Sequence, residues 1–309
     1  MTSQQALVAV ILVNWNGRQD TLACLDSLRQ VDYPALKIIL VDNASTDGLV
    51  AVVNADYPEV ELIVSPTNEG FVGGNNLGMA RADAIGADYI LLLNNDTEVA
   101  PDFLGRLVEA AQQPGIGIVG PLIYYHGEPR RIWSAGGRID WGRGDPIALG
   151  EDAWDEGQFG DSPYVVDYVS GCALMIKRET LKAVGPLDPR FFAYYEEVEW
   201  CARVGRAGYR ILVVPQSRIW HKITREARFA SANVGYYMTR NRLLFLKLSR
   251  ARLTAWANTL LLQTGRTILA YTVLPKWRYK ADARQAMIDG VMDFFKGRFG
   301  ARPRVVTTT

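Results

Sequence analysis

The sequence predicts an α/β fold in which a mostly parallel, Rossmann-like β-sheet is flanked by helices and followed by a helical extension. In the first half of the 309-residue chain, apolar runs of strand length alternate with stretches of helical apolar spacing, which is typical of a sheet covered on both faces. Beyond residue 225 the apolar stretches reach helical length, and basic residues interrupt them. We therefore expect an α/β domain over residues 1–225 and a basic helical extension over residues 226–309.

Four apolar runs supply the first strands of the expected sheet. They are Leu7–Val13, Lys37–Val41, Val60–Val64 and Tyr89–Leu93. Between the first two, Arg18–Gln30 carries Leu22, Leu25 and Leu28 on one side of a helix, and each later run is also followed by a turn and a helical stretch. Ligands of parallel sheets bind beyond the carboxyl ends of the strands, so we expect a site among the residues that follow each run.

The middle of the chain is less regular. Residues 121–168 are rich in Gly, Trp and Asp, and we interpret them as a long excursion from the sheet. After it, Val169–Ile176 and Tyr209–Val214 have the apolar character of strands, and Glu196–Arg206 has helical spacing. The sheet is therefore expected to continue with strands on both sides of this helix.

The net charge of +1 conceals an asymmetry along the chain. Residues 1–217 hold 16 basic and 29 acidic residues, whereas residues 218–309 hold 18 basic and 4 acidic ones. Because these basic residues lie among apolar ones, we expect the C-terminal part to contact an anionic membrane surface and not nucleic acid. The alternative is that it packs against the acidic body. No uninterrupted apolar span of about 20 residues occurs, which favours lying on a membrane over crossing it.

Cysteine usage and the N-terminus bear on the compartment. Cys24, Cys172 and Cys201 are odd in number, widely spaced and without metal-ligand spacing, which favours reduced thiols. The chain starts with polar, uncharged residues, and Leu7–Val13 is too short for the apolar core of a signal peptide. We therefore expect a cytoplasmic protein that lies peripherally on the cytoplasmic face of the membrane.

Asp42 follows the second apolar run and opens the segment Asp-Asn-Ala-Ser-Thr-Asp-Gly. A strand-to-helix turn explains Ser45 or Thr46 as a helix cap and Asp47 as an acid in the first helical turn. It does not explain Asp42 well, because a carboxylate directly beyond a buried strand is placed to accept hydrogen bonds from a ligand. We therefore expect Asp42 to be a ligand contact.

Two further strand ends are followed by polar segments. Asn68–Gly78 is a glycine-rich stretch that opens a helix, and its glycines either let the backbone approach a phosphate or form a plain turn. Asn94-Asn95-Asp96 follows the fourth run, and its oxygen atoms suit a hard cation. A polar turn is the alternative there, so neither segment decides the function by itself.

Glu196 and Glu197 begin the expected helix and follow the aromatic segment Phe191–Tyr195. Acids at a helix start are structurally ordinary, yet burial beside aromatic rings raises a carboxyl pKa toward working pH, as a general base requires. His221, one of two histidines, lies shortly after the strand that ends at Val214. Taken alone, all three residues are better explained as structural.

Together these segments resemble the family 2 glycosyltransferases of the rhamnosyltransferase-like kind, which have the GT-A fold. The resemblance covers about residues 7–225, with six segments in the expected order. They are Val13–Gly17, Val41–Gly48, Asn68–Asn76, Leu93–Thr97, Ser170–Ala173 and Phe191–Glu197. One such segment would mean little, whereas six in order are specific. Tyr236-Tyr237 and Arg240-Asn241-Arg242 are also similar to the segment that follows this domain in relatives.

The resemblance implies a donor site for a nucleotide-diphosphate sugar. Asp42 would contact the nucleobase, with Asn14 and Trp15 lining the same pocket. The other residues expected to border the donor are Asn68, Gly70, Gly73, Gly74, Asn75 and Asn95. The excursion over residues 121–168 would shape the acceptor side.

It also implies a metal site and a general base. Asp96 would be the surviving acid of an Asp-x-Asp metal motif, and His221 would match a histidine that reaches the metal or diphosphate, with Mg²⁺ or Mn²⁺ as the ion. Asn94 stands where an acid is frequent, so the donor diphosphate would supply much of the coordination. Glu197 takes the position of the base, where Asp is frequent, and Glu196 that of the preceding acid. Which of these two acts stays open.

The function implied is inverting, metal-dependent hexosyl transfer from a dTDP- or UDP-sugar to a glycan or lipid-linked acceptor in cell-surface polysaccharide or glycolipid synthesis. One alternative, a sugar-phosphate nucleotidyltransferase, is disfavoured because no Gly-rich basic stretch for a triphosphate lies near the N-terminus. The other, a catalytically degenerate glycan- or nucleotide-binding protein, is disfavoured because Asp42, Asp96, Glu197 and His221 are all retained.

Overall fold

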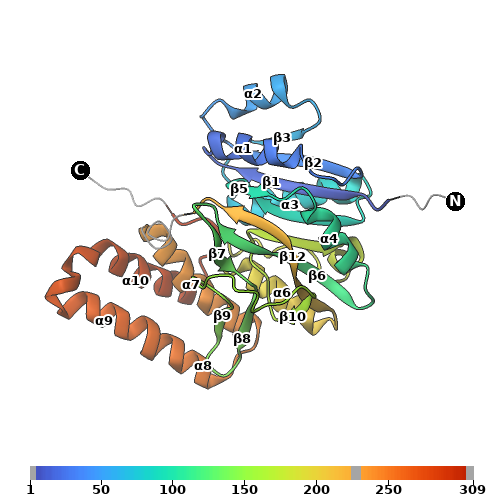
Figure 1. Ribbon diagram of the computed structural model, residues 1–309. Helices are drawn as coiled ribbons and strands as arrows, with labels where there is room; N and C mark the ends of the chain where they lie inside the picture. Colours follow the sequence, from blue (N-terminus) through green and yellow to red (C-terminus); the bar gives the residue numbers. More distant parts are fainter. Residues whose placement is uncertain (1–4, 224–230, 304–309) are drawn as a thin grey trace.

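The computed structural model describes residues 5–223 and 231–303, and it has the α/β architecture that the sequence predicts (Figure 1). The four expected runs form the parallel part of a ten-stranded sheet. These strands are β1 (Val8–Asn14), β2 (Leu36–Asn43), β3 (Glu61–Ser65) and β4 (Tyr89–Asn94). β1 is buried along almost its whole length, because it lies between β2 and β4 and is covered on both faces.

The rest of the sheet mixes parallel and antiparallel pairs. Its strands are β5 (Thr97–Val99), β6 (Ile116–Tyr125), β7 (Glu128–Ser134), β10 (Tyr164–Val166), β11 (Ala173–Lys177) and β12 (Arg210–His221). The strand order is β10-β12-β6-β11-β4-β1-β2-β3, with β5 paired to β12 and β7 to β6. β11 runs antiparallel to both of its neighbours, whereas β12 runs parallel to β6. The parallel pairs therefore lie among β1 to β4 and between β6 and β12, and the antiparallel strand β11 separates the two groups.

Two segments differ from the sequence-based expectation. Residues 121–168 contain β7, β10 and a separate hairpin of β8 (Gly137–Asp140) and β9 (Asp145–Ala148), so this excursion is more regular than expected. β12 continues to His221, seven residues beyond the expected end at Val214. A register shift between Val214 and Arg218 interrupts the apolar run, which is why the strand looks shorter in the sequence than it is.

Helices cover both faces of the sheet. The helices α1 (Arg18–Leu28), α2 (Leu49–Asp56) and α4 (Phe103–Ala111) pack on one face. The helices α3 (Gly70–Ala84), α5 (Arg178–Val184) and α6 (Glu196–Arg206) pack on the other. The two buried clusters on either side of the sheet make the strands apolar on both faces, which explains their continuous apolar runs.

The C-terminal part is helical, as expected. It consists of α7 (Ala232–Leu248), α8 (Leu253–Ala257), the π-helix η2 (Asn258–Gly265), α9 (Arg266–Val273), the 3₁₀-helix η3 (Pro275–Lys280) and α10 (Ala281–Phe295). The residues Leu243–Leu246 of α7 are fully buried in the same core as α3 and α6. Among the described residues, no helix is long and apolar enough to cross a membrane. The C-terminal part thus shares one core with the α/β body through α7, and only its later helices project from it (Figure 1).

Candidate functional site

The carboxyl ends of β1, β2 and β4 meet at Asn14, as the parallel register requires. The buried Asn14 amide donates to Oδ1 of Asp42 at 3.0 Å and to Oγ of Ser45 at 2.9 Å. Its Oδ1 accepts from Oγ1 of Thr21 at 3.0 Å and from Nδ2 of Asn95 at 3.2 Å. This network brings together three residues that the sequence assigned to the donor site, Asn14, Asp42 and Asn95.

The Asp42 carboxylate has hydrogen-bond partners within the fold for both of its oxygen atoms. Its side chain is 1% exposed, and its Oδ2 accepts the N–H of Ser45 at 3.0 Å. Trp15, which follows Asn14, is by contrast 62% exposed, so its ring is an open apolar surface at the end of β1. A nucleobase stacked on Trp15 would lie next to Asp42, and only a small movement of the Ser45 loop would be needed for contact.

The start of α3 is held against the segment that precedes α6. Gly70 has a φ of +72°, and a Cβ there would lie 2.6 Å from the carbonyl oxygen of Phe192. That same oxygen accepts the N–H of Val72 at 3.0 Å, and Oδ1 of Asn68 accepts the N–H of Gly70 at 2.8 Å. Glycine is therefore required at residue 70 by its backbone conformation and by the close approach of Phe192.

The structure gives a packing reason for the next residues of the glycine-rich stretch. Gly74 is buried, and a Cβ there would lie 2.6 Å from Cγ1 of Val13 on β1. Asn75 is 2% exposed, and its amide donates to the Phe71 carbonyl within α3 at 2.9 Å. Gly74 thus lets α3 lie close to β1, whereas Gly73 is half-buried and remains nearer the surface.

Asp96 and His221 come together although they lie far apart in the sequence. The end of β12 pairs with β5, which follows Asp96 directly, so Nε2 of His221 lies 3.0 Å from Oδ1 of Asp96. The His221 side chain is 5% exposed and that of Asp96 is 35% exposed. Burial opposes ionisation of Asp96, but the contact with His221 and the charge of Lys222 outweigh it, and the pKa of Asp96 is lowered. Trp133 lies edge-on to the His221 ring, with centroids 4.6 Å apart.

The donor atoms of this pair fit a divalent cation. Oδ1 of Asp96 is buried without a well-aligned hydrogen-bond partner, and carboxylate oxygen suits Mg²⁺ or Mn²⁺. Nε2 is the His221 nitrogen that faces this oxygen, so these two atoms are the ones that could share a cation. Among the described residues, no group of three or more His, Cys, Asp or Glu side chains could hold a metal. A cation held here would therefore have two such side chains at most, and a bound diphosphate would have to supply other ligands.

Glu196 and Glu197 form a buried carboxylate pair at the start of α6. The preceding Tyr195 has a φ of +71°, and the Oε2 atom of each glutamate has no hydrogen-bond partner. Burial raises the pKa of both carboxyls, and the charge of Glu197 raises that of Glu196 further. Two adjacent buried carboxyls titrate as a pair, and both have the raised pKa that a general base requires.

The loop between β10 and β11 links the two acidic groups. The Cys172 carbonyl accepts the N–H of Asn94 at 2.8 Å, two residues before Asp96. A Cβ at Gly171 would lie 3.5 Å from Cβ of Glu197. The short loop at Gly171 and Cys172 therefore contacts both the segment that leads to Asp96 and the start of α6 at Glu197.

Sequence reasoning noted Arg240 and Asn241 without giving them a role. Both are fully buried on α7, and Nδ2 of Asn241 lies 2.7–2.8 Å from the carbonyl oxygens of Phe191, Ala193 and Tyr194. Nη2 of Arg240 donates to the Phe191 carbonyl at 3.0 Å. These bonds hold the segment directly before Glu196. Charged and amide side chains at two consecutive positions, shortly before the apolar run Leu243–Leu246, are the sequence signal that could have drawn attention to them.

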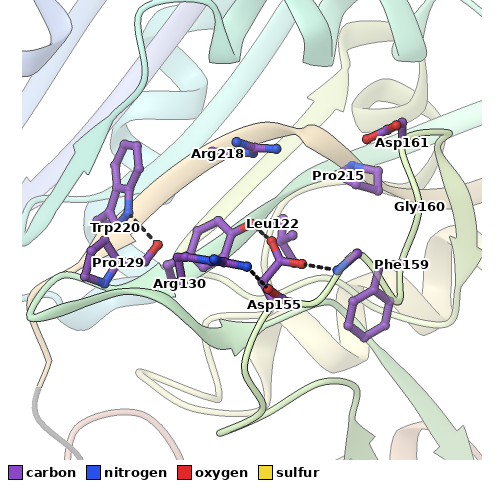
Figure 2. A pocket seen from close by; sticks show the side chains of 12 residues that line it. Leu122, Pro129, Arg130, Asp155, Phe159, Gly160, Asp161, Pro215, Arg218 and Trp220 are labelled. Atoms are coloured by element: carbon purple, nitrogen blue, oxygen red, sulfur yellow. Dashed lines mark hydrogen bonds between the residues drawn. The ribbon is translucent and has the colours of Figure 1, made fainter.

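A cavity of about 380 Å³ opens between β6, β7, β12 and residues 155–161 (Figure 2). The rings of Tyr124 and Trp220 stack along one side with centroids 6.4 Å apart. Nε1 of Trp220 donates to the Pro129 carbonyl at 3.3 Å, and the Tyr124 hydroxyl donates to Asp155 at 2.5 Å. Trp220 precedes His221, so the cavity and the candidate metal ligands lie on opposite faces of the end of β12.

Comparison with protein families places the chain in a known family. The model of the family described as Glycosyl transferase family 2 matches residues 9–185, more than half of the chain. The chain belongs to this family. The matched region includes Asn14, Asp42 and Asp96, whereas Glu197 and His221 lie after it.

Curated relatives of this family 2 glycosyltransferase include several sugar transferases. An N-acetylglucosaminyl-diphospho-decaprenol L-rhamnosyltransferase of Mycobacterium tuberculosis is 26% identical over 232 residues, which cover 70% of this chain and 76% of the relative. A dTDP-rhamnosyl transferase of Shigella flexneri is 22% identical over 248 residues, which cover 78% of this chain and 80% of the relative. The expected likeness to rhamnosyltransferases is thereby confirmed.

Solved structures confirm the GT-A fold. A mannosyltransferase of Pyrobaculum calidifontis in complex with GDP-Man and Mn²⁺ matches with a TM-score of 0.60 and 15% identity, over 96% of this chain and 89% of that chain. GalNAc-T7 with UDP, GalNAc and Mn²⁺ matches with a TM-score of 0.65 and 19% identity, over 98% of this chain and 60% of that chain. At these identities the likeness concerns the fold.

Proposed function

We propose that this glycosyltransferase transfers a hexose from a dTDP- or UDP-sugar to an acceptor hydroxyl with inversion, in the synthesis of a cell-surface polysaccharide or glycolipid. The observation that carries the proposal is that the loop at Gly171 and Cys172 contacts both Glu197, whose Oε2 is buried and unpaired, and the strand end just before the Asp96–His221 pair. A general base and a carboxylate–imidazole pair that could hold a metal, connected through one loop, suit a single displacement at a sugar carbon.

Glu197 acts as the general base in this proposal. Its buried carboxylate takes the proton of the acceptor hydroxyl as that oxygen forms a bond to the anomeric carbon and the bond to the nucleoside diphosphate breaks. Burial raises the pKa of both glutamates, so the pair holds protons more tightly than exposed carboxyls do, and the proposal assigns the ionised member to Glu197. Attack from the side opposite to the leaving group inverts the anomeric centre.

Asp96 and His221 would hold Mg²⁺ or Mn²⁺ together with oxygen atoms of the donor diphosphate. A divalent cation bound there supplies charge stabilisation to the departing nucleoside diphosphate. Asp96 is suited to this role because its lowered pKa keeps it ionised. With only these two side chains, metal affinity is expected to depend on the presence of the nucleotide.

The nucleotide itself is proposed to lie at the ends of β1 and β2. Trp15 offers an exposed ring for the base, while Asp42, Asn14 and Asn95 form the polar floor beneath it. Asn68, Gly70 and Gly73 at the start of α3 would border the ribose or phosphates. The names of the curated relatives, which include a dTDP-rhamnosyl transferase, favour a dTDP-sugar as donor.

The acceptor side is proposed to include the cavity shown in Figure 2. An aromatic platform beside carboxylate and guanidinium groups suits a sugar ring, whose C–H face stacks on Trp220 while its hydroxyls reach Asp155 and Arg218. Because the cavity lies on the other face of β12 from His221, it would bind an acceptor sugar remote from the reacting hydroxyl. Trp220→Ala should then raise the KM for a long acceptor and leave the KM for the donor unchanged.

The experiment that tests the proposal is calorimetric titration of UDP, dTDP and GDP, each with and without Mn²⁺, into the wild type and Asp96→Ala. Binding of one nucleotide that needs Mn²⁺ and is lost in the variant supports the metal-dependent donor site and names the base. If a nucleotide binds equally well with and without Mn²⁺, and equally well to the wild type and to Asp96→Ala, Asp96 is not part of a metal site. If none of the three nucleotides binds, the protein is not a transferase of these donors, and a glycan-binding role would replace the proposal.

A further inference from the structure

We propose that the long helix formed by α8, η2 and α9 lies on an anionic bilayer and inserts one apolar stripe between the lipid headgroups. The inference rests on the proposed function in one respect: a helix placed on the membrane would bring a lipid-linked acceptor within reach of the enzyme. It concerns residues that take no part in the candidate site, so it can fail while the transferase activity stands.

The stripe consists of residues four apart along the helix. Leu253 is 86% exposed, Leu261 is 68% exposed and Leu269 is 61% exposed, and Ala257 and Val273 continue the same spacing. α9 has no buried residue at all. Isolated exposed leucines are normal on a protein surface, but a continuous apolar row along one helix marks an interaction surface.

The π-helical segment keeps this row straight. An α-helix has ~3.6 residues per turn, so residues spaced by four drift steadily around its axis. A π-helix closes each turn with an i→i+5 hydrogen bond and is wider, so the same spacing drifts in the opposite direction there. Because η2 lies between α8 and α9, the two drifts offset each other, and Leu253, Leu261 and Leu269 stay on one side.

The opposite side of this helix faces the protein. Ala255, Thr259 and Thr264 are buried, and α10 lies between α9 and α7. Figure 1 shows α8 to α9 as one long rod at the outer edge of the molecule, away from the sheet. The stripe therefore points away from the body, as a helix that lies in a membrane interface requires.

Charge and aromatic residues at both ends of the helix favour an anionic lipid surface as the occupant. The exposed cations Arg250 and Arg252 precede it, and Lys276 and Lys280 follow it. Nζ of Lys276 lies 5.5 Å from the ring centroid of Trp277, which is the pairing of cation and amphipathic ring found at membrane interfaces.

A second copy of this chain is the other possible occupant of the stripe. The exposed charges at this helix are basic, with Arg266 within it and Arg250 and Arg252 before it, so two copies of this surface would repel each other across a symmetric dimer interface. The same charge attracts anionic headgroups, at about 1 kcal/mol for each basic residue near the surface. Charge complementarity therefore favours an anionic bilayer over a second copy of the chain as the occupant of the stripe.

Vesicle co-sedimentation of the full chain tests the inference. The wild type is compared with Leu261→Glu/Leu269→Glu and with the control Leu77→Glu, an exposed leucine on α3. We expect the wild type and the control to bind vesicles that contain phosphatidylglycerol and to bind pure phosphatidylcholine weakly. The stripe variant should bind these vesicles at least roughly tenfold more weakly for each leucine that is replaced. A second variant, Lys276→Gln/Lys280→Gln, should bind more weakly than the wild type at low salt, and this difference should shrink as added salt screens the attraction.

Two readouts keep the result unambiguous. Transfer to a water-soluble acceptor should be unchanged in the stripe variant, so failure of the proposed function and failure of the membrane inference are distinguishable. Sedimentation velocity without lipid should show one oligomeric state for all variants. Equal vesicle binding by the wild type and the stripe variant overturns the inference, and so does a wild-type dimer that the stripe variant converts to a monomer.

Discussion

At the scale of single residues, the candidate site depends on two adjacent glutamates whose environments differ. Burial raises the pKa of both carboxyls, and the negative charge of Glu197 raises the pKa of Glu196 further. The two carboxyls therefore titrate as a pair, and Glu197 is the proposed base of that pair. The sequence alone could not separate the two, because adjacent residues at a helix start have the same local pattern.

Glu197→Gln should lower turnover by about 10²–10⁴-fold, the usual contribution of a general base, while nucleotide binding is kept. Glu196→Gln should retain most of the activity, because Glu197 and not Glu196 is the proposed base. Steady-state kinetics with calorimetric nucleotide binding distinguish the two variants. If Glu196→Gln is the inactive one, the roles of the glutamates are reversed.

The pH dependence of kcat/KM follows from the same pair. The base must be ionised, and its pKa is raised above the ordinary value for glutamate, about 4.3. Activity should therefore fall as the pH drops through this raised pKa, so the acidic limb of the profile lies above the ordinary glutamate range. A profile whose acidic limb lies at about 4.3 or below would show that the base is an exposed carboxyl elsewhere.

At the scale of secondary structure elements, α3 connects the donor edge to the core. Its glycines allow the helix to lie close to β1, and a Cβ at Gly78 would collide with the Ile11 side chain. The structure therefore explains the later glycines of the stretch Asn68–Gly78 by helix-on-strand packing, and only its first residues by a turn that the sequence also allowed.

Gly78→Ala should destabilise the protein by about 1–3 kcal/mol, because α3 or β1 has to shift to accommodate the methyl group. Gly105→Ala is the matched control. Gly105 also lies within a helix, α4, and its added Cβ would meet no atom within 4 Å. The control should stabilise the protein by up to about 1 kcal/mol through helix propensity. Urea unfolding of both variants measures the difference, and equal effects would contradict the packing account.

At the scale of the whole molecule, α7 joins the C-terminal part to the catalytic edge. Asn241 and Arg240 bind the carbonyls of the segment before α6, in which Phe192, Tyr194 and Tyr195 all have positive φ. Such backbone costs about 1–3 kcal/mol for each residue and persists only where the surroundings hold it. The residues after 225 are thus needed for the geometry of Glu197, and a protein cut at that point should not be active.

Asn241→Ala should lower kcat more than it changes the KM for the donor, because it loosens the segment that positions Glu197 without touching the nucleotide site. The loss of bonds to buried carbonyls should also cost about 1–3 kcal/mol of stability. Asn54→Ala, an exposed residue on α2, is the control. Kinetics at a temperature well below unfolding separate the two effects. A proportional loss of folded protein with unchanged kcat would make Asn241 structural only.

The sequence by itself determined the order of the first strands, the helices between them and the polar residues at their ends. It could do so because buried parallel strands leave continuous apolar runs, and because their carboxyl ends meet at one edge of the sheet. Asn14, Asp42 and Asn95 therefore lie together as expected.

Only the tertiary structure decided which distant residues meet. The contact of Asp96 with His221 depends on β12 running past Val214 to pair with β5, and the sequence pattern ended that strand too early. The support of the Glu197 segment by Asn241 depends on α7 packing in the main core. Periodicity records which face of an element is buried, but the element it is buried against follows from the packing of the whole chain.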